Sequence, residues 1–376
     1  MKRDFGVELI RVIACSIVIG VHVCLGTSVG GRPDIGRLYI ACVFADGVAV
    51  FWLIMGFFLF DNNCYSKLLL RTIRSIVIPM FLFSVILFFT GEWLIDGAPF
   101  FESIKNANGQ IPSALKTLLT WRNPVKNAGH LWYLYIYVLV IVIFPVLKAF
   151  VVWVDQDVKR QKYFILITFT LLMLNDLTNN KLAAFSHYSI NGLFPASIQV
   201  IWGHIFYKNR RLVNIKYFSI TSILLFGMIN VLRCIIQFNR YQEGLGDSIL
   251  YWYSSIGLIC ALCICIFILS LKEKIRSEKI QNNIIKVASY TFLIYLIHTT
   301  IYKVIRRFGL HSCLISGLHS AVGEGWIFEL IYTIAILLIV FMVSFAVSVG
   351  LKKCWSYIKN LVNLILNTVK LHLCEY

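Results

Sequence analysis

The sequence is poor in charge, and its charge is unbalanced. Charged side chains make up 14% of the 376 residues, with 18 Asp and Glu against 35 Lys and Arg, while hydrophobic residues make up 59%. A water-soluble domain with so few charged residues could not cover its own surface. The composition therefore excludes an ordinary soluble protein and indicates an integral membrane protein.

The chain also lacks a long polar linker and a repeat of fixed period. The longest stretch between apolar runs, roughly residues 96–130, is too short for a separate globular domain. We expect one ten-helix transmembrane domain over residues 1–351. A short basic amphipathic tail at 352–376 should follow it and lie on the cytoplasmic surface.

Metal-ligand motifs and nucleic-acid modules are missing. Among the 11 cysteines, Cys260, Cys263 and Cys265 have suggestive spacing but no His or Asp beside them. Most cysteines fall within apolar runs, where a thiol packs as a small apolar group. No basic module stands outside the apolar runs, so the net charge of +17 indicates attraction to anionic membrane lipid. The sequence predicts neither a metal site nor nucleic-acid binding.

Long apolar runs are abundant. A helix needs about 20 apolar residues to cross a bilayer. The first run follows Lys2 and Arg3 as a secretory signal would, but it carries Glu8 and lacks a clear cleavage site, so we expect it to be retained. The sequence predicts an all-α polytopic membrane protein with about ten transmembrane helices. These lie at roughly 5–25, 38–60, 75–95, 131–150, 163–178, 192–207, 217–236, 249–270, 284–304 and 326–350.

Lysine and arginine are unevenly distributed between alternate segments. With the N-terminus inside, the inner segments hold 22 of them and the outer segments 11, while Arg11 and Arg233 fall within apolar runs. Cationic loops are retained on the cytoplasmic side of a membrane. Both termini are therefore predicted to be cytoplasmic.

The first apolar run carries an arginine and a histidine on one helical stripe. Eleven residues of α-helix turn about 1100°, or three turns plus about 20°, so Arg11 and His22 face the same way about 16 Å apart. Glu8, three residues before Arg11, is close enough for an ion pair that lowers the cost of burying the guanidinium. Two interpretations remain open. The stripe faces a cavity, or Arg11 reaches the inner headgroups and His22 caps the outer end.

Other polar residues occur in apolar runs at depths that match His22. They are Asp46 in the second run, His130 at the start of the fourth, Asn191 at the start of the sixth, and Tyr295 and His298 in the ninth. A membrane boundary or a helix–helix hydrogen bond explains each of them singly. Three histidines and an aspartate together favour a polar site near the outer mouth of one bundle.

Several motifs in this order carry a resemblance. They are Arg-x10-His in the first run, VFWLIMGFFLF in the second, HLWYL with Pro145 after it, Asn-Gly before a run that ends in WGHIF, and YLIH. With them the chain resembles the acyltransferase 3 family of ten-span membrane enzymes, and in layout the O-antigen and enterobacterial common antigen O-acetyltransferases. One departure is Met55-Gly56, where many members of the family have Ser-Gly.

The resemblance implies transfer of an acyl group, usually acetyl, from cytoplasmic acetyl-CoA to a hydroxyl of a cell-envelope glycan or lipid-linked sugar in a bacterial inner or plasma membrane. Arg11 and His22 would be the key pair. We expect Arg11 to bind the donor or stabilise the oxyanion, His22 to act as general base, and Asp46 to orient His22 or a partner. The residues expected to bind the acceptor are His130, Trp132, Asn191, Tyr295 and His298.

A transporter or flippase for an envelope polysaccharide precursor is the alternative, because a polar stripe in a bundle also suits a translocation path. An acyltransferase releases free CoA in step with its product, whereas a flippase does not. A structural membrane subunit is a third possibility, and it would tolerate both Arg11→Ala and His22→Ala.

Overall fold

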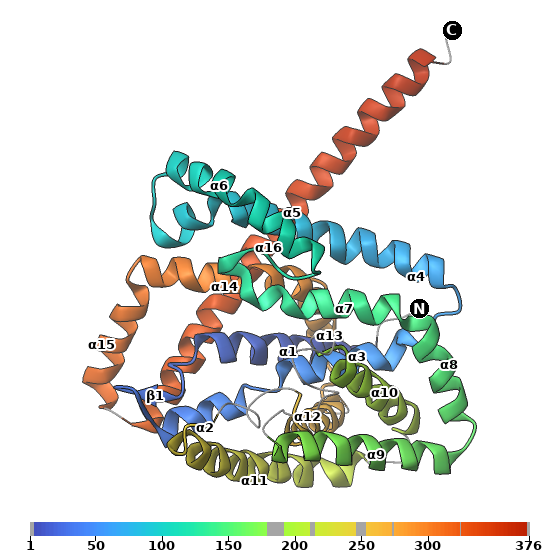
Figure 1. Ribbon diagram of the computed structural model, residues 1–376, viewed down its shortest axis with the longest axis vertical. Coiled ribbons are helices and arrows are strands. Elements are labelled where there is room, and N and C mark those ends of the chain that lie inside the picture. The colour runs from blue at the N-terminus through green and yellow to red at the C-terminus, as the bar shows by residue number, and fades with distance from the viewer. Residues whose placement is uncertain are drawn as a thin grey trace.

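The structure is a computed structural model that describes residues 4–178, 192–210, 215–245, 253–272, 274–323 and 325–373. Within these ranges every element except a two-stranded ribbon is a helix (Figure 1). The predicted all-α fold is confirmed. In chain order the elements are α1 (Phe5–Val23), β1 (Ser28–Val29), β2 (Arg32–Pro33), α2 (Ile35–Val43), α3 (Gly47–Leu59), α4 (Tyr65–Thr72), the π-helix η1 (Ile73–Val77), α5 (Ile78–Gly91), the π-helix η2 (Glu92–Asp96), α6 (Phe100–Leu119), the 3₁₀-helix η3 (Lys126–Leu131), α7 (Trp132–Val142), α8 (Phe144–Asp155), α9 (Val158–Leu177), α10 (Leu193–Asn209), α11 (Ile215–Gln242), α12 (Ser255–Lys272), α13 (Glu278–Ala288), α14 (Thr291–Arg307), α15 (Leu310–Val322) and α16 (Trp326–Leu373).

Helix α1 runs through the middle of the bundle, where it packs against α3, α12, α13, α14 and α16 (Figure 1). Its N-terminal cap is Asp4, whose carboxylate accepts a hydrogen bond of 2.9 Å from the backbone N–H of Gly6. The same carboxylate forms an ion pair of 2.9 Å with Lys272, which ties the start of α1 to the end of α12. Because α1 is surrounded by other helices, its polar stripe can face protein groups instead of lipid.

The structure has fewer candidate spans than the sequence predicts. Among the described residues, six helical segments are long and apolar enough to cross a membrane, or up to eight if each of two bent pairs is one span. The bent pairs are η3–α7 with α8, at 67°, and α13 with α14, at 61°. The predicted spans 163–178 and 192–207 are present as α9 and α10. Neither qualifies alone, because α9 begins with a cluster of cations and α10 has 17 residues.

Helices α3 and α10 are in direct backbone contact. A Cβ on Gly56 of α3 would lie 1.9 Å from the carbonyl oxygen of Val200, and a Cβ on Gly203 of α10 would lie 2.2 Å from that of Leu53. Small residues at such crossings let two backbones approach closely within a membrane. The two glycines therefore fix α3 against α10.

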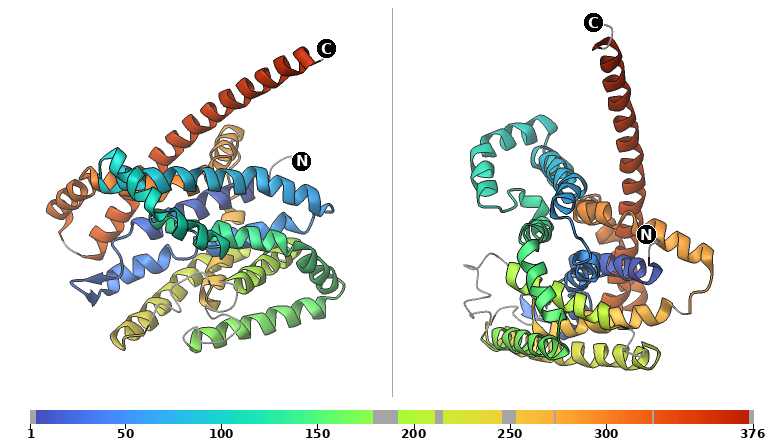
Figure 2. Two further views of the ribbon diagram at one scale, coloured as in Figure 1. Left: turned by 45° about the horizontal axis from the view of Figure 1, so that its top comes forward. Right: turned by 90° about the vertical axis from the view of Figure 1, so that its right-hand side faces the viewer.

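The last helix extends well beyond the bundle. Helix α16 continues unbroken from Trp326 to Leu373, and its C-terminal part projects away from the other helices (Figures 1 and 2). The tail expected at 352–376 thus begins as a continuation of α16. That it lies on the cytoplasmic surface stays a prediction.

Candidate active site

Arg11 and Glu8 form the ion pair that their spacing on α1 predicts. An Nη atom of Arg11 lies 2.7 Å from a carboxylate oxygen of Glu8. The Glu8 side chain is almost fully buried at 7% exposure, whereas that of Arg11 keeps 30% exposure. The pair therefore leaves part of the guanidinium available, and this part faces a cavity.

The cavity has a volume of about 330 Å³ and lies between α1, α3, α4, α7 and α14. Two of its lining residues are cationic, Arg11 and Arg71, and none is acidic. Among the described residues the complete lining is Arg11, Phe51, Ile54, Met55, Phe58, Leu59, Asn62, Leu68, Arg71, Ile76, Tyr133, Leu134, Tyr137, Thr291, Phe292 and Tyr295. A mostly apolar cavity with two guanidinium groups suits a ligand that is anionic at one end.

Met55 is one of these lining residues. At this position the cavity wall therefore carries a thioether. Arg71 was not anticipated as a site residue. Its sequence position shows only that it follows the second apolar run, and nothing in that position predicts that α4 carries it to the cavity wall.

Tyr295 joins the cavity to a second group of residues. It lines the cavity, and its ring centroid lies 5.6 Å from that of His130 and 5.7 Å from that of His298. Its hydroxyl donates a hydrogen bond to the backbone carbonyl of His130. One side chain thus borders both the cation-lined space and a histidine cluster.

The histidine cluster consists of His22, His130 and His298, which come from α1, η3 and α14. Their ring centroids are separated by 5.0 Å for His130 and His298, 5.2 Å for His22 and His298, and 6.3 Å for His22 and His130. The structure therefore brings together the three histidines that the sequence places at matching depths. It describes no group of three or more His, Cys, Asp or Glu arranged to hold a metal ion.

The three histidines differ in exposure and in hydrogen bonding. His130 is buried, with one ring nitrogen 3.0 Å from the carbonyl oxygen of Leu296 and the other 2.8 Å from the hydroxyl of Thr299. A carbonyl oxygen can only accept, so Nε2 of His130 donates and Nδ1 accepts from Thr299. His298 is buried as well, whereas His22 is exposed. Of the three, His22 is the one that an external molecule can reach.

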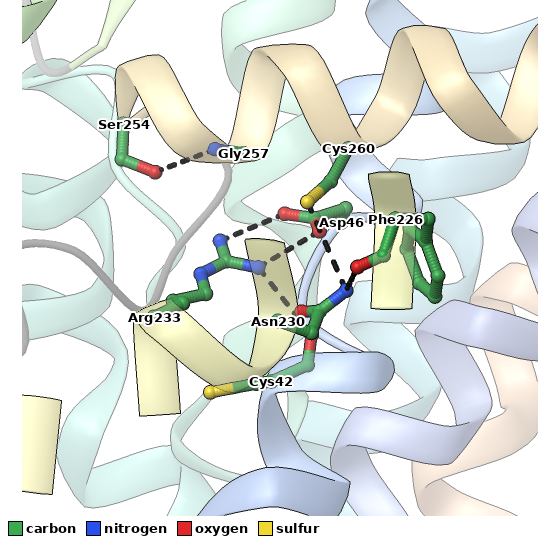
Figure 3. Close-up of polar contacts among 8 residues, drawn as sticks. All are labelled: Cys42, Asp46, Phe226, Asn230, Arg233, Ser254, Gly257 and Cys260. Carbon is green, nitrogen blue, oxygen red and sulfur yellow. Dashed lines mark hydrogen bonds and ion pairs between the residues drawn. The ribbon is translucent and has the colours of Figure 1, made fainter. Parts of the chain in front are cut away.

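Asp46 is held by an arginine of another helix. As Figure 3 shows, the guanidinium of Arg233 on α11 binds both carboxylate oxygens, at 2.8 and 2.9 Å. The same arginine donates to the carbonyl of Cys42 at 3.3 Å. Both charged side chains are completely buried, at 0% exposure. The partner of Asp46 is therefore Arg233 and not His22.

Of two other residues expected to bind the acceptor, one lies outside the cavity lining and the other cannot be placed. Trp132 begins α7 and is half-buried, with its ring 6.3 Å from that of Tyr133. It is not among the residues that line the cavity. Asn191 lies outside the described residues.

These features define a polytopic helical membrane protein with a cation-lined cavity beside a histidine cluster. Residues 4–352 match the family described as "Acyltransferase domain", and the chain belongs to this family, as the resemblance to acyltransferase 3 enzymes predicts. The match covers nearly the whole chain, so the protein is a membrane acyltransferase. The comparisons found no matching curated protein and no matching solved structure.

Proposed function

We propose that this protein transfers an acetyl group from cytoplasmic acetyl-CoA to a hydroxyl of a cell-envelope glycan or lipid-linked sugar, in a bacterial inner or plasma membrane. The observation that carries the proposal is the pair of guanidinium groups in the cavity lining, Arg71 and the part of Arg11 that its ion pair with Glu8 leaves exposed. Coenzyme A bears several phosphate charges, and guanidinium groups bind phosphate through paired hydrogen bonds.

In this proposal the transfer is direct. The acceptor oxygen attacks the thioester carbonyl carbon, His22 takes the hydroxyl proton, and the carbon–sulfur bond breaks to release the CoA thiolate. If the guanidinium of Arg11 reaches the oxygen of the thioester carbonyl, it would stabilise the negative charge that develops on that oxygen. The proton on His22 then passes to the departing thiolate. No metal is invoked in this scheme.

The acceptor would approach from the His22 side, because His22 is the exposed member of the cluster. In this scheme His130, His298 and Tyr295 form the wall behind His22. Trp132 and Asn191 remain candidates for contacts with the acceptor. Membrane lipid would surround the bundle.

The test uses purified protein in lipid nanodiscs, labelled acetyl-CoA and an envelope glycan fraction as acceptor. Arg11→Ala should weaken donor binding, and Arg11→Lys should restore it only in part, because an ammonium group lacks the planar fork of a guanidinium. Arg160→Ala is the matched control, since Arg160 binds the carbonyl of Trp153 outside the cavity lining. Normal donor binding by the Arg11→Ala protein would refute the assignment of Arg11.

The same assay separates transfer from transport. An acetyltransferase should release one CoA for each acetylated product, and mass spectrometry of the glycan should show a gain of one acetyl group. If glycan moves across the membrane without CoA release, the flippase alternative is correct.

A further inference from the structure

His298 carries a nitrogen atom that the proposed reaction leaves unused. The side chain is 1% exposed, and its Nδ1 lies 2.7 Å from the backbone carbonyl oxygen of Tyr295. Because a carbonyl oxygen only accepts hydrogen bonds, Nδ1 carries the hydrogen and Nε2 carries a lone pair. Nε2 is buried and has no hydrogen-bond partner among the described residues. Buried polar atoms are rarely left unpaired, so this one requires an explanation.

The ring best placed to supply a hydrogen is His22. Both nitrogens of His130 already have partners in Leu296 and Thr299. His22 has no such bonds within the part of the chain that the structure describes, and its ring centroid lies 5.2 Å from that of His298. As the two rings lie in the structure, their planes are tilted by 47° and no hydrogen bond joins them. Ring nitrogens lie about 1.2 Å from the ring centre, so a rotation of the His22 ring that points one of its nitrogens at Nε2 would bring the two atoms to about 3 Å. That is an ordinary hydrogen-bond length.

We propose that His298 positions His22 by accepting a hydrogen bond from it. This inference rests on the proposed function and adds a role for a residue otherwise expected only to contact the acceptor. When one nitrogen of His22 donates to Nε2 of His298, the other nitrogen of His22 keeps its lone pair and faces the acceptor. The Tyr295 carbonyl, by holding Nδ1–H of His298, fixes the tautomer of both rings.

The proton balance follows from this chain of hydrogen bonds. The acceptor hydroxyl loses its proton to the free nitrogen of His22 as its oxygen attacks the thioester. The imidazolium that forms on His22 is stabilised by the proposed N–H bond to the neutral His298. His298 gains no proton, and His22 returns its own to the CoA thiolate. Because His298 is buried while His22 is exposed, His298 is a positioning residue and His22 the catalytic one.

Two substitutions at His298 separate the possible roles. In His298→Asn, the amide NH₂ takes the place of Nδ1–H and keeps the bond to Tyr295, but nothing remains at the position of Nε2. In His298→Gln, the amide oxygen reaches the position of Nε2 and can accept from His22, although it cannot take up a proton at neutral pH. His298→Asn therefore keeps the bond to Tyr295 and loses the bond to His22, whereas His298→Gln keeps the bond to His22 and loses the bond to Tyr295.

The expected result is that His298→Asn lowers kcat by about 10²–10⁴-fold with an unchanged KM for acetyl-CoA. His298→Gln should keep kcat within about tenfold of wild type, since the bond to His22 is retained. If both variants lose activity alike, His298 is itself the base, and the inference is wrong. If Asn is active and Gln is inactive, only the bond to Tyr295 matters, and the inference is again wrong.

A second measurement does not depend on acyl transfer. Nitrogen-15 NMR of histidine-labelled protein in lipid, with the His22 signals assigned by their loss in His22→Gln, reports which nitrogen of His22 carries hydrogen. One tautomer should dominate in the wild type and in His298→Gln, and a mixture should appear in His298→Asn. An unchanged tautomer in His298→Asn would overturn the inference. If the tautomers behave as expected but the wild type transfers no acetyl group, the proposed function fails and the positioning role stands.

Discussion

Replacing Asp46 by Asn should destabilise the protein, because it removes the carboxylate charge that binds the buried guanidinium of Arg233. Both side chains are completely buried and are joined by two hydrogen bonds of 2.8 and 2.9 Å. Removing one partner of a buried ion pair costs about 3–5 kcal/mol. An asparagine oxygen can still accept one of the two bonds, so we expect the lower end of this range, about 3 kcal/mol.

The double variant Asp46→Leu/Arg233→Leu is the matched control, because it removes both charges together. It should be more stable than Asp46→Leu alone, since exchange of a buried pair for apolar residues is often neutral. The assay is the fraction of detergent-solubilised protein that stays monodisperse after heating, with acetyl transfer measured on the surviving protein. If Asp46 and Arg233 only stabilise the fold, acetyl transfer should return in the double variant. If Asp46→Asn keeps its thermal stability but loses transfer, Asp46 acts in the reaction and our reasoning is refuted.

Two further substitutions test the packing and the base. Gly56→Ala should strongly reduce the folded protein in the membrane, because the added Cβ would lie 1.9 Å from the Val200 carbonyl, whereas Gly227→Ala has nothing within 4 Å and should be neutral. Equal abundance of the two would contradict the contact between α3 and α10. His22→Gln should lower transfer by about 10²–10⁴-fold with normal donor binding, and the wild-type rate should fall as acid charges the imidazole. A glutamine variant with a near wild-type rate would remove His22 from the mechanism.

Features that depend on local spacing could be predicted from the sequence. The helical repeat alone places Glu8 next to Arg11, and the structure has this pair at 2.7 Å. Apolar run length likewise predicts most of the helices. The depth of each polar residue along its run also indicated that the histidines would meet. His22, His130 and His298 come together because α14 packs against both α1 and η3.

Features that depend on the packing of distant helices could not be predicted. Asp46 and Arg233 are 187 positions apart, and no local pattern indicates that α11 turns its arginine toward α3. The same holds for Arg71, which reaches the cavity only because of how α4 lies against α7. The bend between α7 and α8 was also missed, because residues 131–150 are apolar on both sides of it. The rotation and the bending of a helix depend on the side chains of the helices packed against it. The sequence of one apolar run does not show which helices these are.

The close contact between α3 and α10 has a consequence for the passage of the donor. Since Gly56 and Gly203 leave no space between the two backbones, α3 and α10 must move as one body. Phe51 and Met55, which line the cavity from α3, therefore move together with α10. A widening of the cavity therefore requires α1, α4, α7 or α14 to move relative to this pair. A rearrangement that admits or releases a large molecule is thus a change in how the surrounding helices pack against a rigid two-helix unit.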